Sequence, residues 1–141
     1  MIAIIRISGR VKMKRKIEET LLRLRIQRKY TCNVFNPSKE NLGMVKKVEN
    51  FVAYGEINQD TLEKLIEKRG QLINKKKKID SKKAAEELLK GKKYEELNLK
   101  PFFRLHPPRM GIDSKKHFGE TKKGVLGNNK EKINDLILRM L

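Results

Sequence analysis

The sequence predicts an α+β fold, with a compact strand-helix-strand-helix-strand core over residues 1–57 and a helical and irregular extension over residues 58–141. Three observations predict it. Short apolar runs alternate with stretches in which apolar residues recur every three or four positions, and this alternation places helices against one sheet. Gly and Pro residues separate these segments. A chain of 141 residues with 38% hydrophobic residues suffices for one domain with a modest core.

The first strand and the first helix of this core are expected at residues 2–7 and 14–26. IAIIRI is a continuous apolar run, which is typical of a central strand, and Gly9 ends it. In KRKIEETLLRLRI, the apolar residues that share one helical face are Ile17, Leu21 and Leu24. Leu22 and Ile26 fall on the opposite side, so we expect something else to pack there.

A second strand, a second helix and a third strand complete the core. TCNVF at 31–35 has the composition of a strand and is stopped by Asn36-Pro37. Ser38 is placed to cap the next helix, because its hydroxyl can accept a hydrogen bond from the first turn. The apolar stripe of that helix consists of Leu42, Val45 and Val48. FVAYGEI at 51–57 is the third strand.

The extension is expected to contain three helices and one arm, all packed on the core. The helices fall at about 59–69, 81–90 and 129–140. Their inward-facing residues include Leu62, Leu65, Ile66, Ile133, Leu136, Ile137 and Met140. Residues 101–127 are rich in Pro, Gly and basic residues and are typical of an irregular arm, which Phe102 and Phe103 should anchor to the core.

The composition indicates a polyanionic partner. The chain has 35 Lys+Arg residues against 17 Asp+Glu, and a net charge of +18 repels itself unless a polyanion neutralises it. No run approaches 18 apolar residues, so we expect no membrane partner. The single cysteine, Cys32, excludes an internal disulfide and suits a reducing cytoplasm. A basic body with Pro/Gly-rich arms favours a folded RNA as the partner.

We do not expect catalysis from this sequence. It contains no CxxC, no HExxH, no phosphate-binding loop that ends in Gly-Lys-Ser/Thr, and no G-x-S-x-G. His106 and His117 are too far apart in the chain to be paired ligands on one helical face. The lysines around them disfavour binding of a cation. The expectation is therefore no enzyme activity, no cofactor, no metal and no small-molecule substrate.

RNA contacts are predicted along the first helix, on the second helix and on the arm. Between Arg6 and Lys29 the only acids are Glu18 and Glu19, and such a basic stripe can follow phosphates and release their counterions. On the arm, Pro107-Pro108 should stiffen the chain before Arg109. The predicted RNA-binding residues are Arg6, Arg10, Lys12, Lys14, Arg15, Lys16, Arg23, Arg28, Lys29, Lys46, Lys47, Arg104, His106, Arg109, Lys115, Lys116 and His117.

Three segments of the sequence carry a family resemblance. The longest is LLRLRIQRKYTCNVFNPSKENLGMVKKVENFVAYGEI at 21–57, in which GMVKKVENFVAYG is the most specific piece. LIEKRG at 65–70 and FRLHPPRMG at 103–111 follow. With a C-terminal helix that ends near Met140, these segments resemble the large-subunit ribosomal protein L-thirty family, whose eukaryotic counterpart is L-seven, in its longer archaeal form. Asn33 departs from the β-branched residue usual in that family.

The resemblance covers essentially the whole chain and has implications for fold and function. It implies a core with a likeness to ferredoxin-like folds and incorporation into the large subunit of cytoplasmic ribosomes. It also implies contacts with large-subunit ribosomal RNA, a position near the 5S ribosomal RNA, and neighbouring large-subunit proteins as partners. Two alternatives stay open at this point: a free RNA-binding module or RNA chaperone that acts off the ribosome, and a small RNA-processing enzyme that uses the histidines.

Overall fold

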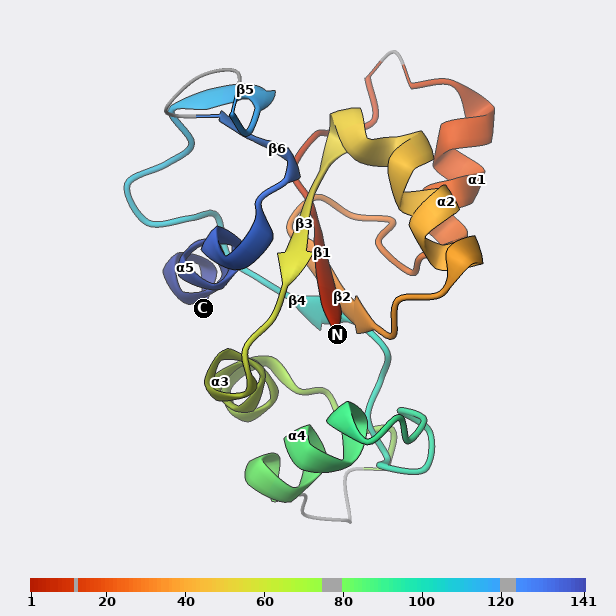
Figure 1. The fold of residues 1–141 in the computed structure, drawn as a ribbon, viewed down its shortest axis with the longest axis vertical. Helices are drawn as coiled ribbons and strands as arrows, with labels where there is room; N and C mark the ends of the chain where they lie inside the picture. The colour runs from red at the N-terminus through yellow and green to blue at the C-terminus, as the bar shows by residue number, and fades with distance from the viewer. Residues whose placement is uncertain (12, 75–79, 120–123) are drawn as a thin grey trace.

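A computed structural model describes residues 1–141 apart from 12, 75–79 and 120–123, and it contains a mixed six-stranded sheet (Figure 1). The strand order is β4-β2-β1-β3-β6-β5. The strands are β1 (Ile2–Arg6), β2 (Thr31–Phe35), β3 (Val52–Glu56), β4 (Phe103–Arg104), β5 (Ser114–His117) and β6 (Gly124–Asn128). The predicted α+β class is confirmed.

Strand β1 lies inside the sheet, as its apolar run predicts. It pairs antiparallel with β2 on one side and with β3 on the other. Successive side chains of a strand point to opposite faces of the sheet. Ala3 and Ile5 therefore enter one hydrophobic cluster, and Ile4 enters another on the opposite face. Burial of both faces explains why this run does not alternate with polar residues.

One face of the sheet is covered by α1 (Arg15–Arg23) and α2 (Lys39–Val48), which lie side by side in Figure 1. A short 3-10 turn, η1 (Glu49–Phe51), joins α2 to β3. The Ser38 hydroxyl accepts a hydrogen bond from the Asn41 backbone N–H at 3.1 Å, so the predicted cap of α2 is confirmed. The cluster under these helices consists of Ile4, Leu21, Leu24, Ile26, Val45, Val48 and Val52.

The end of α1 differs from the prediction, because the helix stops at Arg23 and does not continue to residue 26. Arg25 adopts a left-handed backbone conformation with φ 58°. Its N–H donates to the Leu22 carbonyl at 2.9 Å, and the Ile26 N–H donates to the Leu21 carbonyl at 3.0 Å. These two bonds form a Schellman motif, which turns the chain back over the helix end. Ile26 is consequently buried with Leu21, and the expectation that it faces away from the core is wrong.

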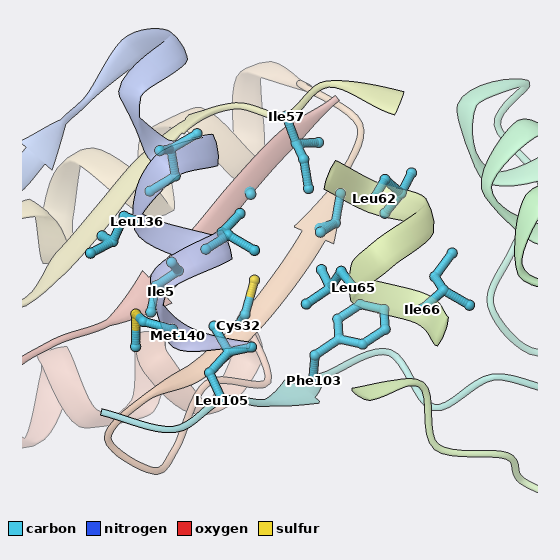
Figure 2. Packing of buried hydrophobic residues seen from close by; sticks show 14 of the residues in the cluster. Ile5, Cys32, Ile57, Leu62, Leu65, Ile66, Phe103, Leu105, Leu136 and Met140 are labelled. Carbon is cyan, nitrogen blue, oxygen red and sulfur yellow. The ribbon is translucent and has the colours of Figure 1, made fainter. Parts of the chain in front are cut away.

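The opposite face of the sheet is covered by α3 (Gln59–Arg69) and α5 (Ile133–Met140), with α4 (Ser81–Leu89) packed against α3. A 3-10 turn, η2 (Lys130–Lys132), precedes α5. Leu62, Leu65 and Ile66 of α3 belong to the hydrophobic cluster on this face, and Figure 2 shows Leu65 beside Phe103 of β4. Cys32 lies in this cluster, and burial raises the pKa of its thiol well above the ordinary value. It therefore behaves as a small apolar side chain.

Residues 101–127 are more regular than the expected arm. β4 pairs antiparallel with β2, and β6 pairs parallel with β3, so both segments extend the same sheet as β1. Each pairing satisfies backbone donors and acceptors that an open sheet edge leaves exposed. This edge pairing depends on segments far apart in the sequence, and local composition gives no signal of it.

Strand β3 lies very close to the start of α5 at Gly55. A Cβ atom at this position would meet the Lys130 carbonyl oxygen and the Ile133 side chain. We predict that Gly55→Ala lowers the free energy of unfolding by about 1 to 3 kcal/mol through overpacking. The matched control is Gly43→Ala in the exposed part of α2, where a new Cβ meets nothing within 4 Å. It should raise that free energy by about 0.5 to 1 kcal/mol. Urea unfolding of both variants checks this, and equal effects would contradict the described contact.

Candidate nucleic-acid interface

Most of the predicted RNA-binding residues lie at the surface. Lys12 is outside the described residues, and His117 is half-buried. The exposed ones are Arg10, Lys14, Arg15, Lys16, Arg23, Arg28, Lys29, Lys46, Lys47, Arg104, His106, Arg109, Lys115 and Lys116. They do not form one continuous site: they lie around α1 and its flanking loops, on α2, on β4, on the 106–111 turn and on β5.

Arg6 is the exception, because it is only 1% exposed. Its guanidinium donates to three backbone carbonyls: Ser8 at 3.0 Å, Gly9 at 3.3 Å, and Gln27. Burial, and next the positive charge of Arg10, lower the pKa of Arg6. Arg6 thus ties the end of β1 to the loop that follows α1. The structure gives it this internal role in place of the predicted RNA contact, because its donors are already used by the protein.

A first hollow of about 390 Å³ lies beside the exposed start of α1. It is lined by Arg6, Arg10, Arg15, Glu18, Glu19, Leu22 and Gln27. Arg10 forms an ion pair with Glu18, and Arg15 Nε lies 3.4 Å from Glu19 Oε1. The positive charges of this hollow are therefore largely balanced by carboxylates of the same chain.

A second hollow of about 370 Å³ adjoins the first and shares Leu22 and Gln27 with it. It is lined by Leu22, Arg25, Gln27, Arg28, Thr31, Pro101, Phe102 and Arg104. We call it the arginine hollow, because three guanidinium groups and no carboxylate line it. In the part of the chain that the structure describes, none of these three arginines forms an ion pair. Their charge is available to an external anion.

Arg25 is a lining residue that sequence reasoning missed. It occupies the left-handed position of the Schellman motif, which glycine favours and most side chains avoid. The signal was an arginine where a helix end usually has Gly or Asn, and it becomes visible only when the helix is known to stop at Arg23. The Asn33 side chain fixes the same helix end, because its Nδ2 donates to the Leu24 carbonyl at 2.9 Å.

Phe102 is a second lining residue that the sequence did not identify as part of the site. Its neighbour Phe103 is fully buried, which confirms the predicted anchor, but Phe102 is half-buried and faces the arginine hollow. The Arg104 guanidinium carbon lies 5.8 Å from the centroid of the Phe102 ring. Residues two apart in an extended segment share a face, so β4 and the residue before it present a ring and a guanidinium together.

The predicted rigid turn at Arg109 is present, and α5 holds it in place. The Gly111 N–H donates to the Pro108 carbonyl at 2.9 Å, and Met110 between them has φ 64°. The Arg139 side chain donates to the carbonyls of Arg109 and Gly111, each at 2.8 Å from Nη2. Met110 is 92% exposed at the tip. Arg139, which sequence reasoning did not single out, therefore fixes the backbone that presents Arg109.

The two histidines are not brought together as a pair. His106 is exposed in the segment after β4, and its backbone N–H donates to the Met140 carbonyl at 3.0 Å. His117 ends β5, where its Nε2 lies 2.6 Å from Asn50 Oδ1. Among the described residues no group of three or more His, Cys, Asp or Glu side chains is arranged to hold a metal ion. The described helices include none that is long and apolar enough to span a membrane.

Comparison with known proteins agrees with the motifs in the sequence. Residues 2–52 match the family model of Ribosomal protein L30p/L7e. The chain is 39% identical to the large ribosomal subunit protein uL30 of Nanoarchaeum equitans over 99% of this chain and 97% of that protein. It is also 39% identical to the uL30 protein of Archaeoglobus fulgidus, over 99% of each chain. With the uL30 protein of Aeropyrum pernix, it shares 38% identity over 99% of this chain and 98% of that protein. The chain therefore belongs to the Ribosomal protein L30p/L7e family.

Proposed function

We propose that this protein is a structural component of the large ribosomal subunit in the cytoplasm, and that it binds large-subunit ribosomal RNA and stabilises its fold. The arginine hollow is the observation that carries the proposal. It concentrates three guanidinium groups without a carboxylate on a chain whose net charge is +18. The names of the uL30 relatives support the assignment to the large subunit.

The charge distribution around α1 favours a long anion over a small one. Lys16 and Arg23 are exposed on the helix, and Arg28 and Lys29 are exposed in the loop after it, next to the arginine hollow. An RNA strand that crosses this surface exchanges condensed counterions for these side chains, and the release of the counterions drives binding. A single small anion could occupy only one part of this surface. The finer placement near the 5S ribosomal RNA, beside neighbouring large-subunit proteins, rests on the family resemblance.

The proposed role is positional and does not involve catalysis. In the described residues the histidines lie apart, and the arginine hollow has no acid or base facing a guanidinium-bound phosphate. Guanidinium groups hold phosphate oxygens through paired hydrogen bonds in a fixed plane. The site can therefore bind and orient an RNA segment.

Sedimentation of an extract in a sucrose gradient tests the assignment to the ribosome. The protein should migrate with large subunits and stay there through a high-salt wash, because an integral component buries its charged surface against RNA. Release into the top fractions by the wash would favour a free RNA-binding module or chaperone. A matched gradient of dissociated subunits separates large-subunit from small-subunit association.

The arginine hollow predicts a specific salt dependence of RNA binding. The plot of log Kobs against log salt has a negative slope. Arg25→Gly and Arg28→Gln should each make this slope shallower by about 0.7 to 0.9, the value for one lost phosphate contact. Arg25→Gly should keep or raise stability, because glycine favours the left-handed backbone at this position. Filter binding to large-subunit RNA at several salt concentrations measures the slopes.

The controls for this series are Arg10→Gln and Arg15→Gln in the first hollow. These guanidinium groups already face Glu18 and Glu19, so their loss should change the slope less. Equal slope changes in both hollows would show that only total charge matters, and that the arginine hollow is not a distinct contact.

The turn at Arg109 predicts a difference between arginine and lysine. Arg109→Ala should weaken RNA association by about 1 to 3 kcal/mol, because a charged hydrogen bond to phosphate is lost. Arg109→Lys should recover only part of this, because an ammonium cannot make the bidentate contact. His106→Ala should weaken RNA association less than Arg109→Ala does. Affinity measurements on the three variants check the order, and full recovery by lysine would contradict a bidentate contact.

A further inference from the structure

We propose that the arginine hollow holds one unpaired nucleotide of the RNA, with its base stacked on Phe102 and its phosphate bound by Arg25 and Arg28. This inference rests on the proposed RNA-binding function and adds the chemical class of the group that the hollow accepts. Nothing in the family resemblance or in the relatives' names assigns such a site.

The lining of the hollow combines the two surfaces that a nucleotide needs. Its apolar lining residues are Pro101, Phe102 and Leu22, and Leu22 is 51% exposed. Arg25 and Arg28 supply guanidinium groups on the same hollow. A volume of about 370 Å³ lies in the range of pockets that accept a small organic group. A phosphate alone would leave the ring and the leucine uncovered.

Stacking is the interaction that Phe102 and Arg104 are suited to make. The guanidinium carbon of Arg104 lies over the Phe102 ring, 5.8 Å from its centroid, so a base can extend this arrangement by stacking on the free face of either group. Nucleobases in protein complexes stack on both aromatic rings and guanidinium planes. The neighbouring Phe103 is fully buried, so the core does not require Phe102 as an anchor.

The charge of the hollow favours RNA over a neighbouring protein as its occupant. An apolar side chain from a protein would remove three guanidinium groups from water without bringing an anion, and unpaired buried charges are costly. A nucleotide brings its own phosphate to the same place as its base. Leu22, for which the sequence predicted an outside partner, then packs against the base or sugar.

The backbone at Arg25 supports a ligand-binding role for its side chain. A left-handed conformation is uncommon for an arginine and costs free energy that glycine would not cost. The Schellman motif needs only a residue that tolerates this conformation, and it gains nothing from the guanidinium. An arginine at this position therefore indicates a use outside the helix end, and its side chain lines the hollow.

The nucleotide must be unpaired, because a base inside a duplex presents its edges and keeps its faces stacked on its neighbours. Only a base from a bulge, loop or strand end can turn its face to a protein ring. The hollow is sized for one such base, and the exposed arginines and lysines around α1 can hold the adjoining backbone.

The test separates stacking from charge in the binding of the full chain to purified large-subunit RNA. Phe102→Leu removes the ring and keeps every charge, so affinity should fall about 5- to 150-fold, as for one lost stacked base, with no change in the salt slope. Phe102→Tyr keeps a stacking ring and should bind as the wild type does. The matched control Leu89→Ala, on an exposed leucine of α4, should have no effect. Thermal unfolding verifies that each variant folds.

Ultraviolet crosslinking of the complex, followed by mass spectrometry, gives a second readout. A nucleotide adduct on the peptide that contains Phe102 supports the proposal. Unchanged affinity of Phe102→Leu overturns the stacking site while leaving RNA binding in place. A variant that binds naked RNA normally but enters large subunits poorly also overturns it, because a neighbouring protein then covers the hollow. Failure of the wild type to bind the RNA removes the proposed function and this inference together.

Discussion

The burial of β1 on both faces is the constraint on which the rest of the structure depends. Ile4 points to the α1–α2 side, and Ala3 and Ile5 point to the α3–α5 side, so one short strand needs two separate layers of helices. Arg6 follows Ile4 on the α1–α2 side of this alternation, and Ile7 after it is again buried on the other side. The Arg6 guanidinium reaches the carbonyls of the surrounding loops and bonds to that of Gln27. The interior of the sheet thereby orders the loop that carries Arg25 and Arg28.

The arginines of this chain contribute equally to its net charge, but their guanidinium groups contact different partners. The Arg6 guanidinium donates hydrogen bonds to backbone carbonyls. The Arg139 guanidinium donates to carbonyl oxygens of the 108–111 turn and holds it in place. Arg10, which precedes α1, and Arg15, which begins it, both face carboxylates of α1. The arginines of the arginine hollow have no such partner in the described structure. The balance of charge within each hollow, and not the total, is the basis on which we propose the arginine hollow as the site for an RNA phosphate.

Periodicity and cap chemistry in the sequence predicted the core well, because those signals are local. The strand at 31–35, the Ser38 cap and the inward face of α3 all follow from neighbours within a few residues. The candidate site was harder, because it depends on non-local geometry. A shift of one residue in β4 would exchange Phe102 and Phe103 between surface and core, and only its pairing with β2 sets this register. Arg25 resembled an ordinary helical residue until the helix end was known.

The two cores differ in how much of the chain they need, and this has a consequence for synthesis. Every buried residue of the cluster under α1 and α2 lies between Ile4 and Val52, so this layer can close when less than half of the sequence has been made. The cluster on the other side also requires Ile133, Ile137 and Met140, which come much later in the chain. A nascent chain therefore carries one finished layer and one open apolar face until α5 is released. Folding of the second layer must wait for the synthesis of α5, whereas the layer that carries the arginines around α1 can form earlier.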